Sequence, residues 1–84
     1  FYVIQSQKDL NYFYKGSTNN LDRRLASHNM GEVFSSSPYR PYKLVYYEAY
    51  LYEFAARIRE SAVKTSGSVS VPLLRRVRDS LKTR

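Results

Sequence analysis

The sequence contains no cysteine and no tryptophan, and it has a single histidine among its 84 residues. The absence of cysteine excludes a disulfide framework, a thiolate zinc site and a cysteine nucleophile. No apolar run approaches the roughly 20 residues that a membrane-spanning helix needs, and the first residues lack the pattern of a signal peptide. We therefore expect no membrane contact, and a cytoplasmic location fits a small cysteine-free domain. Phe1 is not an initiator methionine, which is compatible with a fragment of a longer protein.

Acidic residues are also scarce, because seven Asp and Glu face fourteen Lys and Arg and leave a net charge of +7. This surplus favours a polyanionic partner, since each contact with a phosphate releases condensed counterions. Nine tyrosines and four phenylalanines could stack on bases or contact phosphates, but they could equally fill strands. Composition therefore favours nucleic acid as the partner over an acidic protein or a membrane surface.

The first half of the chain predicts a β-hairpin followed by a helix. Residues 1–6 and 12–16 are short β-prone runs that are joined by the polar residues 7–9. On such strands Tyr2 shares a face with Ile4, and Tyr12 shares one with Tyr14. Residues 20–30 read as a helix, because Asn20 offers a cap oxygen and Gly31 is placed as a stop.

The second half predicts one more strand and two more helices. A loop over 32–42 leads to a strand over 43–50, and residues 51–63 are helical by composition. Residues 65–71 read as a Ser/Gly connector, after which Pro72 is acceptable in the first turn of a last helix. An apolar stripe runs along that helix at Leu73, Leu74, Val77 and Leu81. The predicted order is β-β-α-β-α-α in a single domain over residues 1–84, whose length allows one small core.

One segment carries the strongest signal. Tyr14-Lys15-Gly16 (YKG) precedes a polar turn and a helix on which Arg24 and His28 lie four residues apart. This segment resembles the second half of the GIY-YIG signature, and Tyr2 matches the tyrosine of the first half. The glycine of that first half would lie ahead of Phe1. Two later blocks also resemble the family in order and spacing, namely RPYKLVYYE from residue 40 and ARIRE at 56–60. The sequence thus resembles the GIY-YIG nucleases to about residue 64, in particular small single-domain members and the N-terminal domain of excision-repair nucleases.

The resemblance implies an α+β (α/β) fold with a small three-stranded mixed or antiparallel sheet flanked by helices, and divalent-metal-dependent hydrolysis of DNA. It implies that Glu60 holds one Mg²⁺ or Mn²⁺ ion, which accepts a single carboxylate with water completing its shell. Arg24 would bind the phosphate with its planar fork. Tyr2 and Tyr14 would position or deprotonate the attacking water, and which of them is the base stays open. His28 would share proton transfer or bind phosphate.

Nucleic-acid contacts are expected from five cations. These are Lys15, Arg23, Arg24, Arg40 and Lys64. Lys15 departs from the family because it replaces the apolar residue of the motif, so its side chain must either snorkel or face the site. Ser17 stands where excision-repair members often carry a basic residue. The last helix adds a basic stripe that either contacts phosphates or is a solvated face: Arg75, Arg76, Arg78, Lys82 and Arg84.

Each site residue also has a structural interpretation. Tyr14 could be a packed strand aromatic, Arg24 a surface charge, His28 a helix cap and Glu60 only the i,i+4 partner of Lys64. Their coincidence at the family's spacing favours a metal-dependent endonuclease directed by substrate structure rather than sequence, in DNA repair or processing.

Two other hypotheses remain. The first is a catalytically inactive module that binds DNA or RNA with the same fold. The second is a piece of a larger repair or restriction enzyme, although the layout of a stand-alone member favours a single domain. Since one site cuts one strand, a double-strand cut would need a homodimer, a partner protein or two successive events.

Overall fold

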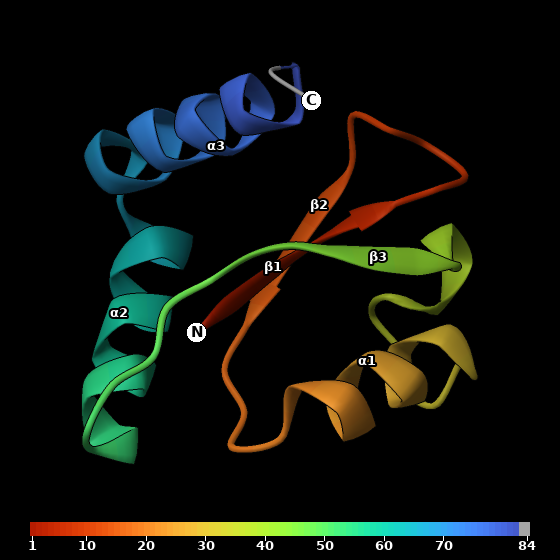
Figure 1. The fold of residues 1–84 in the computed structure, drawn as a ribbon, viewed down its shortest axis with the longest axis horizontal. Coiled ribbons are helices and arrows are strands. Elements are labelled where there is room, and N and C mark those ends of the chain that lie inside the picture. The colour runs from red at the N-terminus through yellow and green to blue at the C-terminus, as the bar shows by residue number, and fades with distance from the viewer. Residues whose placement is uncertain (83–84) are drawn as a thin grey trace.

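The computed structural model describes residues 1–82, and Arg84 lies outside the described residues. Within that range the chain forms a three-stranded sheet and three α-helices in the predicted order (Figure 1). The strands are β1 (Tyr2–Ser6), β2 (Phe13–Gly16) and β3 (Tyr42–Tyr47). The helices are α1 (Leu21–Asn29), α2 (Glu53–Thr65) and α3 (Gly67–Lys82), with a short 3₁₀ turn, η1, at Ser37–Tyr39. The α+β prediction is confirmed, and the sheet is antiparallel throughout with the order β2-β1-β3.

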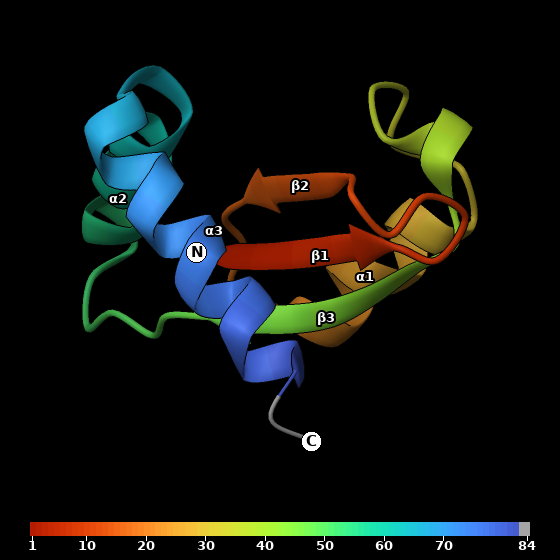
Figure 2. The ribbon, with the colours of Figure 1, turned by 90° about the horizontal axis from the view of Figure 1, so that it is seen from above.

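The sheet is covered on both faces because its central strand is apolar on both sides. Tyr2 and Ile4 point toward α1 and form one core with Tyr42, while Phe1 and Val3 form a second core on the opposite face. Figures 1 and 2 show α1 on one side of the sheet and α3 on the other, with α2 beside the end where β1 begins.

Helices α2 and α3 are held to the sheet by their apolar stripes. Val63, Leu73 and Val77 are almost fully buried against Phe1 and Val3. Removing each of these side chains from water contributes roughly 1.5–3 kcal/mol. The stripe predicted for the last helix thus packs against the sheet, which leaves the opposite face of α3 to its cations.

The ends of α1 follow from local chemistry, as predicted. The Asn20 side chain accepts a hydrogen bond from the Arg23 amide at 3.0 Å and so caps the first turn. Gly31 follows the helix with a φ of 80°, a left-handed conformation that only glycine adopts without strain. These two residues fix the length of α1, and hence how far along it Arg24 and His28 lie.

Two predicted boundaries were wrong. The third strand runs from Tyr42 to Tyr47 rather than over 43–50, because after the Glu48 amide bonds Phe1 O at 2.8 Å the chain leaves the sheet. The connector over 65–71 is helical, since only Ser66 separates α2 from α3 and its carbonyl accepts the amides of Val69 and Ser70. Pro72 therefore lies inside α3, near enough to its start to cost one intrahelical hydrogen bond.

Candidate active site

A buried hydrogen bond between Tyr2 on β1 and His28 on α1 lies at the centre of the candidate site. The Tyr2 hydroxyl is 2.8 Å from His28 Nε2, and the two rings meet edge to face. Tyr2 is 2% exposed and His28 is fully buried. Because both polar groups are removed from water, each needs a protein partner for every proton it carries.

The hydrogen-bond partners of His28 decide which of its nitrogens carries the proton. Ser36 is the partner on one side. Its Oγ lies 2.6 Å from His28 Nδ1, and its own proton is donated to Val33 O at 3.3 Å. Arg24 Nε already donates to the Tyr2 hydroxyl, so the proton of that hydroxyl goes to His28 Nε2. Nδ1 then carries the imidazole proton and donates it to Ser36 Oγ. The contact from Ser36 Oγ to Val33 O is compatible with this direction.

Gly16 and Arg24 enclose the Tyr2 hydroxyl from two further sides. A Cβ atom at Gly16 would lie 2.6 Å from Tyr2 Oη, closer than side chains approach one another, so only glycine fits at the end of β2. Arg24 is four residues before His28 on α1 and donates from Nε to Tyr2 Oη at 3.4 Å. The glycine of the motif is therefore required by the tyrosine of the neighbouring strand.

Tyr14 lies on the same face and is more accessible than Tyr2. Its ring centre is 4.8 Å from that of His28, and its hydroxyl contacts Ser35 Oγ at 3.4 Å. The ammonium of Lys64, on α2, lies 5.7 Å from the centre of the Tyr14 ring. Tyr14 and Arg24 are both half-buried, so they form the solvent-facing part of the site.

Glu60 reaches this cluster from α2. Its carboxylate accepts from Ser17 Oγ at 2.5 Å and from Lys64 Nζ at 2.7 Å, which confirms the predicted i,i+4 pair. Burial alone would raise the pKa of Glu60, but the hydrogen bonds from Lys64 and Ser17 outweigh it and hold that pKa below its ordinary value. Glu60 therefore presents an ionised carboxylate, with 23% of its side chain exposed.

The pKa values of Tyr2 and His28 are shifted in opposite directions. Burial raises the pKa of Tyr2 above its ordinary value of 10.0, although the hydrogen bond from Arg24 opposes this. Burial, with the positive charge of Arg24 as a smaller cause, lowers the pKa of His28 to about 4. At neutral pH Tyr2 is therefore a neutral donor and His28 a neutral acceptor, in agreement with the direction of the hydrogen bonds from Arg24 to Ser36.

The other predicted cations are not gathered around the tyrosine hydroxyls. Lys15 is paired with Val3 in the sheet, so it points to the face covered by α2 and α3 and snorkels there. Arg40 bonds Ser37 O at 3.0 Å beside η1, and Arg23 is exposed on α1. Lys64 is the cation that joins Arg24 at the site.

Three residues escaped prediction as parts of this region: Ser17, Ser36 and Glu48. Ser36 is one of three consecutive serines, and nothing in the sequence distinguishes it from its neighbours. Ser17 was noted only as a missing positive charge. Glu48 could have been found, because Tyr46, Glu48 and Tyr50 alternate in the sequence.

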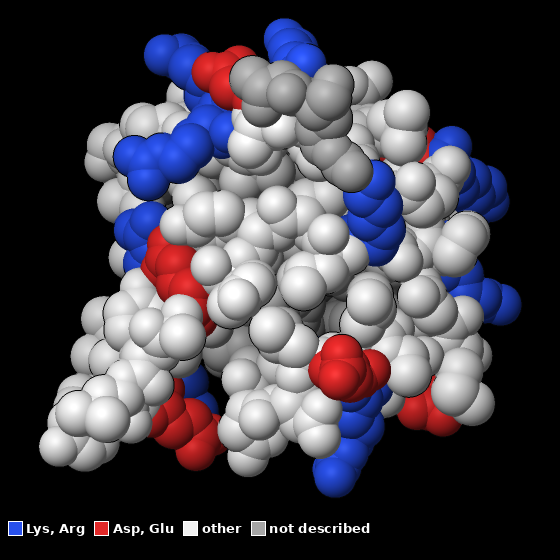
Figure 3. Space-filling model, in the orientation of Figure 1, with Lys and Arg blue, Asp and Glu red and all other residues white. Residues whose placement is uncertain are grey.

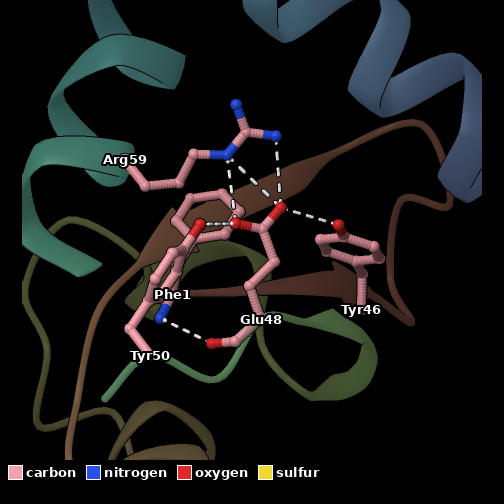
Figure 4. A network of polar contacts seen from close by, with 5 residues as sticks. All are labelled: Phe1, Tyr46, Glu48, Tyr50 and Arg59. Atoms are coloured by element: carbon pink, nitrogen blue, oxygen red, sulfur yellow. Dashed lines mark hydrogen bonds and ion pairs between the residues drawn. The ribbon is translucent and has the colours of Figure 1, made fainter. Parts of the chain in front are cut away.

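Glu48 joins the end of β3 to α2. Its carboxylate accepts from Tyr46 Oη at 2.6 Å, from Tyr50 Oη, and from Arg59 Nε and Nη2 at 3.1 Å each (Figure 4). Burial opposes ionisation of Glu48, but these three donors hold its pKa below the ordinary value. Phe1 lies beneath the Arg59 guanidinium, 5.9 Å from its ring centre. The loop that follows β3 is thus tied to the sheet and to α2 at one point.

Residues 1–82 contain no cluster of three or more His, Cys, Asp or Glu side chains that could hold a metal ion. They also contain no helix that is long and apolar enough to cross a membrane. A single ionised carboxylate at Glu60, with room for water around it, suits one hard divalent cation. Lys64 Nζ now faces that carboxylate, and its exposed, flexible side chain can swing away.

The chain was compared with known proteins. The family model described as the GIY-YIG catalytic domain matches residues 1–68. The search of curated proteins and the search of solved structures give no match. The matched segment ends just after α2, so it includes every residue of the hydrogen-bonded cluster around Tyr2 and Glu60.

Proposed function

Because the chain belongs to the family of GIY-YIG catalytic domains, which implies nuclease chemistry on nucleic acid, we propose that it is a divalent-metal-dependent endonuclease that hydrolyses phosphodiester bonds in DNA. The observation that carries the proposal is the chain of hydrogen bonds from Arg24 through Tyr2 to His28 and Ser36. Such a buried, directional chain is not needed for binding alone, and it places a proton acceptor beside a phosphate ligand.

The phosphate would lie at Arg24. Among residues 1–82 the guanidinium bonds only Tyr2, through Nε, so its two terminal nitrogens remain for two phosphate oxygens. Lys64 lies nearby on α2 and adds a second positive charge. Positive groups that are already in place where negative charge develops stabilise the transition state, because they need not rearrange during the reaction.

The proton of the attacking water would pass to Tyr2 and on to His28. As Tyr2 takes a proton from water, its own proton moves along the existing hydrogen bond to His28 Nε2. The hydroxide forms a new bond to phosphorus, and the bond to the leaving oxygen breaks. We assign the base to Tyr2 rather than Tyr14, because the Tyr14 hydroxyl lies 3.4 Å from Ser35 and has no comparable acceptor.

A bound Mg²⁺ or Mn²⁺ ion supplies charge stabilisation for the phosphoryl and leaving oxygens and makes a nearby water more acidic. Glu60 would hold it through a carboxylate that Ser17 orients and keeps ionised. Lys64, which now pairs with Glu60 at 2.7 Å, would instead contribute its positive charge to the phosphate.

A second candidate function is an inactive binding module, and the Lys64–Glu60 ion pair at 2.7 Å favours it. In that case Lys64 would neutralise the carboxylate permanently, and Arg24 would hold a phosphate without cleaving it. The two candidates differ in what Glu60→Gln does. The substitution would abolish cleavage in a nuclease and leave binding unchanged in a module.

The test is cleavage of labelled duplex, single-stranded and branched DNA, and of matching RNA, with Mg²⁺, Mn²⁺ or EDTA. Glu60→Gln is compared with Asp79→Asn, which removes the same charge from an exposed position on α3 outside the cluster. Metal-dependent cutting that is lost in Glu60→Gln and kept in Asp79→Asn supports the proposal. Binding without cutting of any substrate, unaltered by Glu60→Gln, would replace it with the binding module.

Branched DNA is included because we propose that shape rather than sequence selects the substrate, as in repair or processing. A single site cuts one strand, so cutting both would need a second copy or two events. A duplex nicked on one strand under single-turnover conditions is the expected product.

A further inference from the structure

A groove of about 530 Å³ lies between two loops, beside the site of phosphodiester chemistry. One wall is the β2–α1 loop, with Ser17, Thr18 and Asn19. The other wall is the end of β3 and the β3–α2 loop, with Tyr47, Tyr50 and Tyr52. One side of the groove therefore offers hydrogen-bonding groups, and the facing side offers aromatic rings.

The three tyrosines are exposed to a degree that a small core does not require. They retain 59%, 41% and 60% of their accessible surface. In Figure 3 the area over the start of α2, at the lower left, projects from the molecule as an uncharged surface. Exposed aromatic side chains that lie together mark a binding surface more often than single exposed residues do.

Tyr50 is held in place before any ligand arrives. Its hydroxyl donates to Glu48, which is itself fixed by Tyr46 and Arg59 (Figure 4). A ring already restrained in this way loses little conformational entropy when a ligand stacks on it. The Glu48 network thus gives the groove a rigid aromatic wall.

Tyr52 occupies a position where helix stability favours a different residue. It is the N-cap of α2, yet its side chain makes no capping hydrogen bond. Ser, Thr, Asp or Asn would stabilise the helix there. The Tyr52 ring stacks on that of Phe54 at 5.8 Å, but Phe54 is itself 64% exposed, so this pair buries little surface and the tyrosine at the cap points to a use outside the fold.

Charge distinguishes the groove from the site of the phosphate. Its two carboxylates are each neutralised by an arginine, Glu53 by Arg57 in the lining itself and Glu48 by Arg59 behind it. A neutral lining suits an uncharged base better than a phosphate. The groove is also continuous with the catalytic cluster, because Ser17 lines it and donates to Glu60 at 2.5 Å.

We propose that this groove binds an unpaired base of a single-stranded segment that flanks the scissile phosphate. The base would stack on the tyrosine wall, and its edge would face the amide of Asn19, which has no hydrogen-bond partner among residues 1–82. The inference rests on the proposed function, since it places the flanking nucleotide relative to a phosphate at Arg24. It makes a junction between duplex and single strand the preferred substrate.

A nucleic acid fits this surface better than a second copy of the chain does. The net charge of +7 makes two copies repel one another and attracts a polyanion. The side-chain amide of Asn19 would also be left without partners under an apolar protein surface. Self-association is accordingly measured as a competing outcome.

The test measures binding, so that it does not depend on cleavage. Fluorescence anisotropy in Ca²⁺ compares three labelled DNAs, namely a blunt duplex, the same duplex with a short single-stranded flank, and one whose flank has the same sugar-phosphate backbone but no bases. The wild type should bind the flanked duplex about tenfold more tightly than the other two, given the usual contribution of one stacked base. Tyr52→Ser should remove this preference and at the same time raise Tm by a few degrees, because it adds a helix cap.

Leu10→Ala is the matched control, since Leu10 is 60% exposed like Tyr52 but lies in the β1–β2 turn, outside the groove. It should keep the full preference for the flanked duplex. A Tyr52→Ser variant that retains the preference, or a wild type that binds the base-free flank as tightly, overturns the proposal. So does self-association in sedimentation experiments that Tyr52→Ser abolishes while DNA binding stays unchanged. Loss of cleavage with the flank preference intact would instead count against the proposed function alone.

Discussion

Replacing Ser36 with alanine would remove the group that orients His28 without touching any residue that meets the substrate. Ser36 Oγ accepts from His28 Nδ1 at 2.6 Å inside a fully buried pocket. With alanine at this position, the Nδ1–H of His28 has no hydrogen-bond partner. If the proton moves to Nε2 instead, two donors face each other, because the Tyr2 hydroxyl also points its proton there. In either case Tyr2 loses the acceptor that the proposed mechanism needs.

The expected magnitudes follow from burial. An unsatisfied buried donor costs about 1–3 kcal/mol of folding stability. For a domain of this size, a loss of about 2 kcal/mol lowers Tm by roughly 10 °C. The cleavage rate should fall by at least about tenfold, because general-base catalysis typically contributes a factor of about 10²–10⁴ and the base is misdirected rather than deleted. The affinity for DNA should not change, since Arg24 and Lys64 are untouched.

The assay combines three measurements on one variant. ¹⁵N NMR of the imidazole reports which nitrogen of His28 is protonated, thermal unfolding gives Tm, and single-turnover cleavage gives the rate. Ser6→Ala is the control, because Ser6 is equally buried and its Oγ donates to Tyr39 O at 2.6 Å and accepts from the amides of Lys8 and Asp9, with no bond to the histidine. It should lower Tm comparably while leaving the tautomer and the rate unchanged. If Ser36→Ala keeps the wild-type tautomer and rate, or if Ser6→Ala slows cleavage equally, the relay through His28 is refuted.

Three further outcomes are expected. Gly16→Ala should lower both Tm and the cleavage rate, because its Cβ would lie 2.6 Å from Tyr2 Oη and displace the ring, and a normal melting curve would contradict this. Stability should fall between pH 6.5 and pH 4 by at most about 3 kcal/mol, because the pKa of His28 is lowered to about 4 in the folded state and the unfolded chain binds the extra proton. His28→Gln should flatten the Tm profile over that interval. Glu48→Gln should weaken the contact with Arg59 and loosen the tyrosine wall, so that anisotropy shows a smaller preference for flanked DNA with the affinity for blunt duplex unchanged.

The parts of the fold that the sequence predicted correctly are those decided by local chemistry. Asn20 and Gly31 mark the ends of α1 because a cap oxygen and a positive φ act within one turn of the chain. The alternation of Tyr2 and Ile4 predicted the face they share, since side chains on a strand alternate wherever the strand lies. The resemblance to the family added Arg24 and Glu60, both of which lie close enough to Tyr2 to affect its pKa, but their roles stay predictions.

The remaining features depend on contacts between distant segments. Residues 65–71 have the composition of a connector, but the burial of Leu73 and Val77 against the sheet favours continuing the helix back to Gly67. Lys15 could be assigned to a face of the sheet only once its pairing with Val3 was known. Ser36 is chemically identical to the serines beside it, and only the fold brings its hydroxyl to His28.

The complete burial of His28 restricts how protons would move in the proposed reaction. Nδ1 is bonded to Ser36, whose proton is committed to Val33 O, so a proton received at Nε2 has Tyr2 as its one bonded route out. The imidazole of His28 would then receive one proton from Tyr2 during each cleavage event and return it through the same hydroxyl. The chemical step would need no proton exchange with the bulk solvent, so the rate of a single turnover should be insensitive to buffer concentration. The rate of repeated turnover would be limited by how quickly the product leaves Arg24, because only then can Tyr2 pass the proton of His28 to solvent.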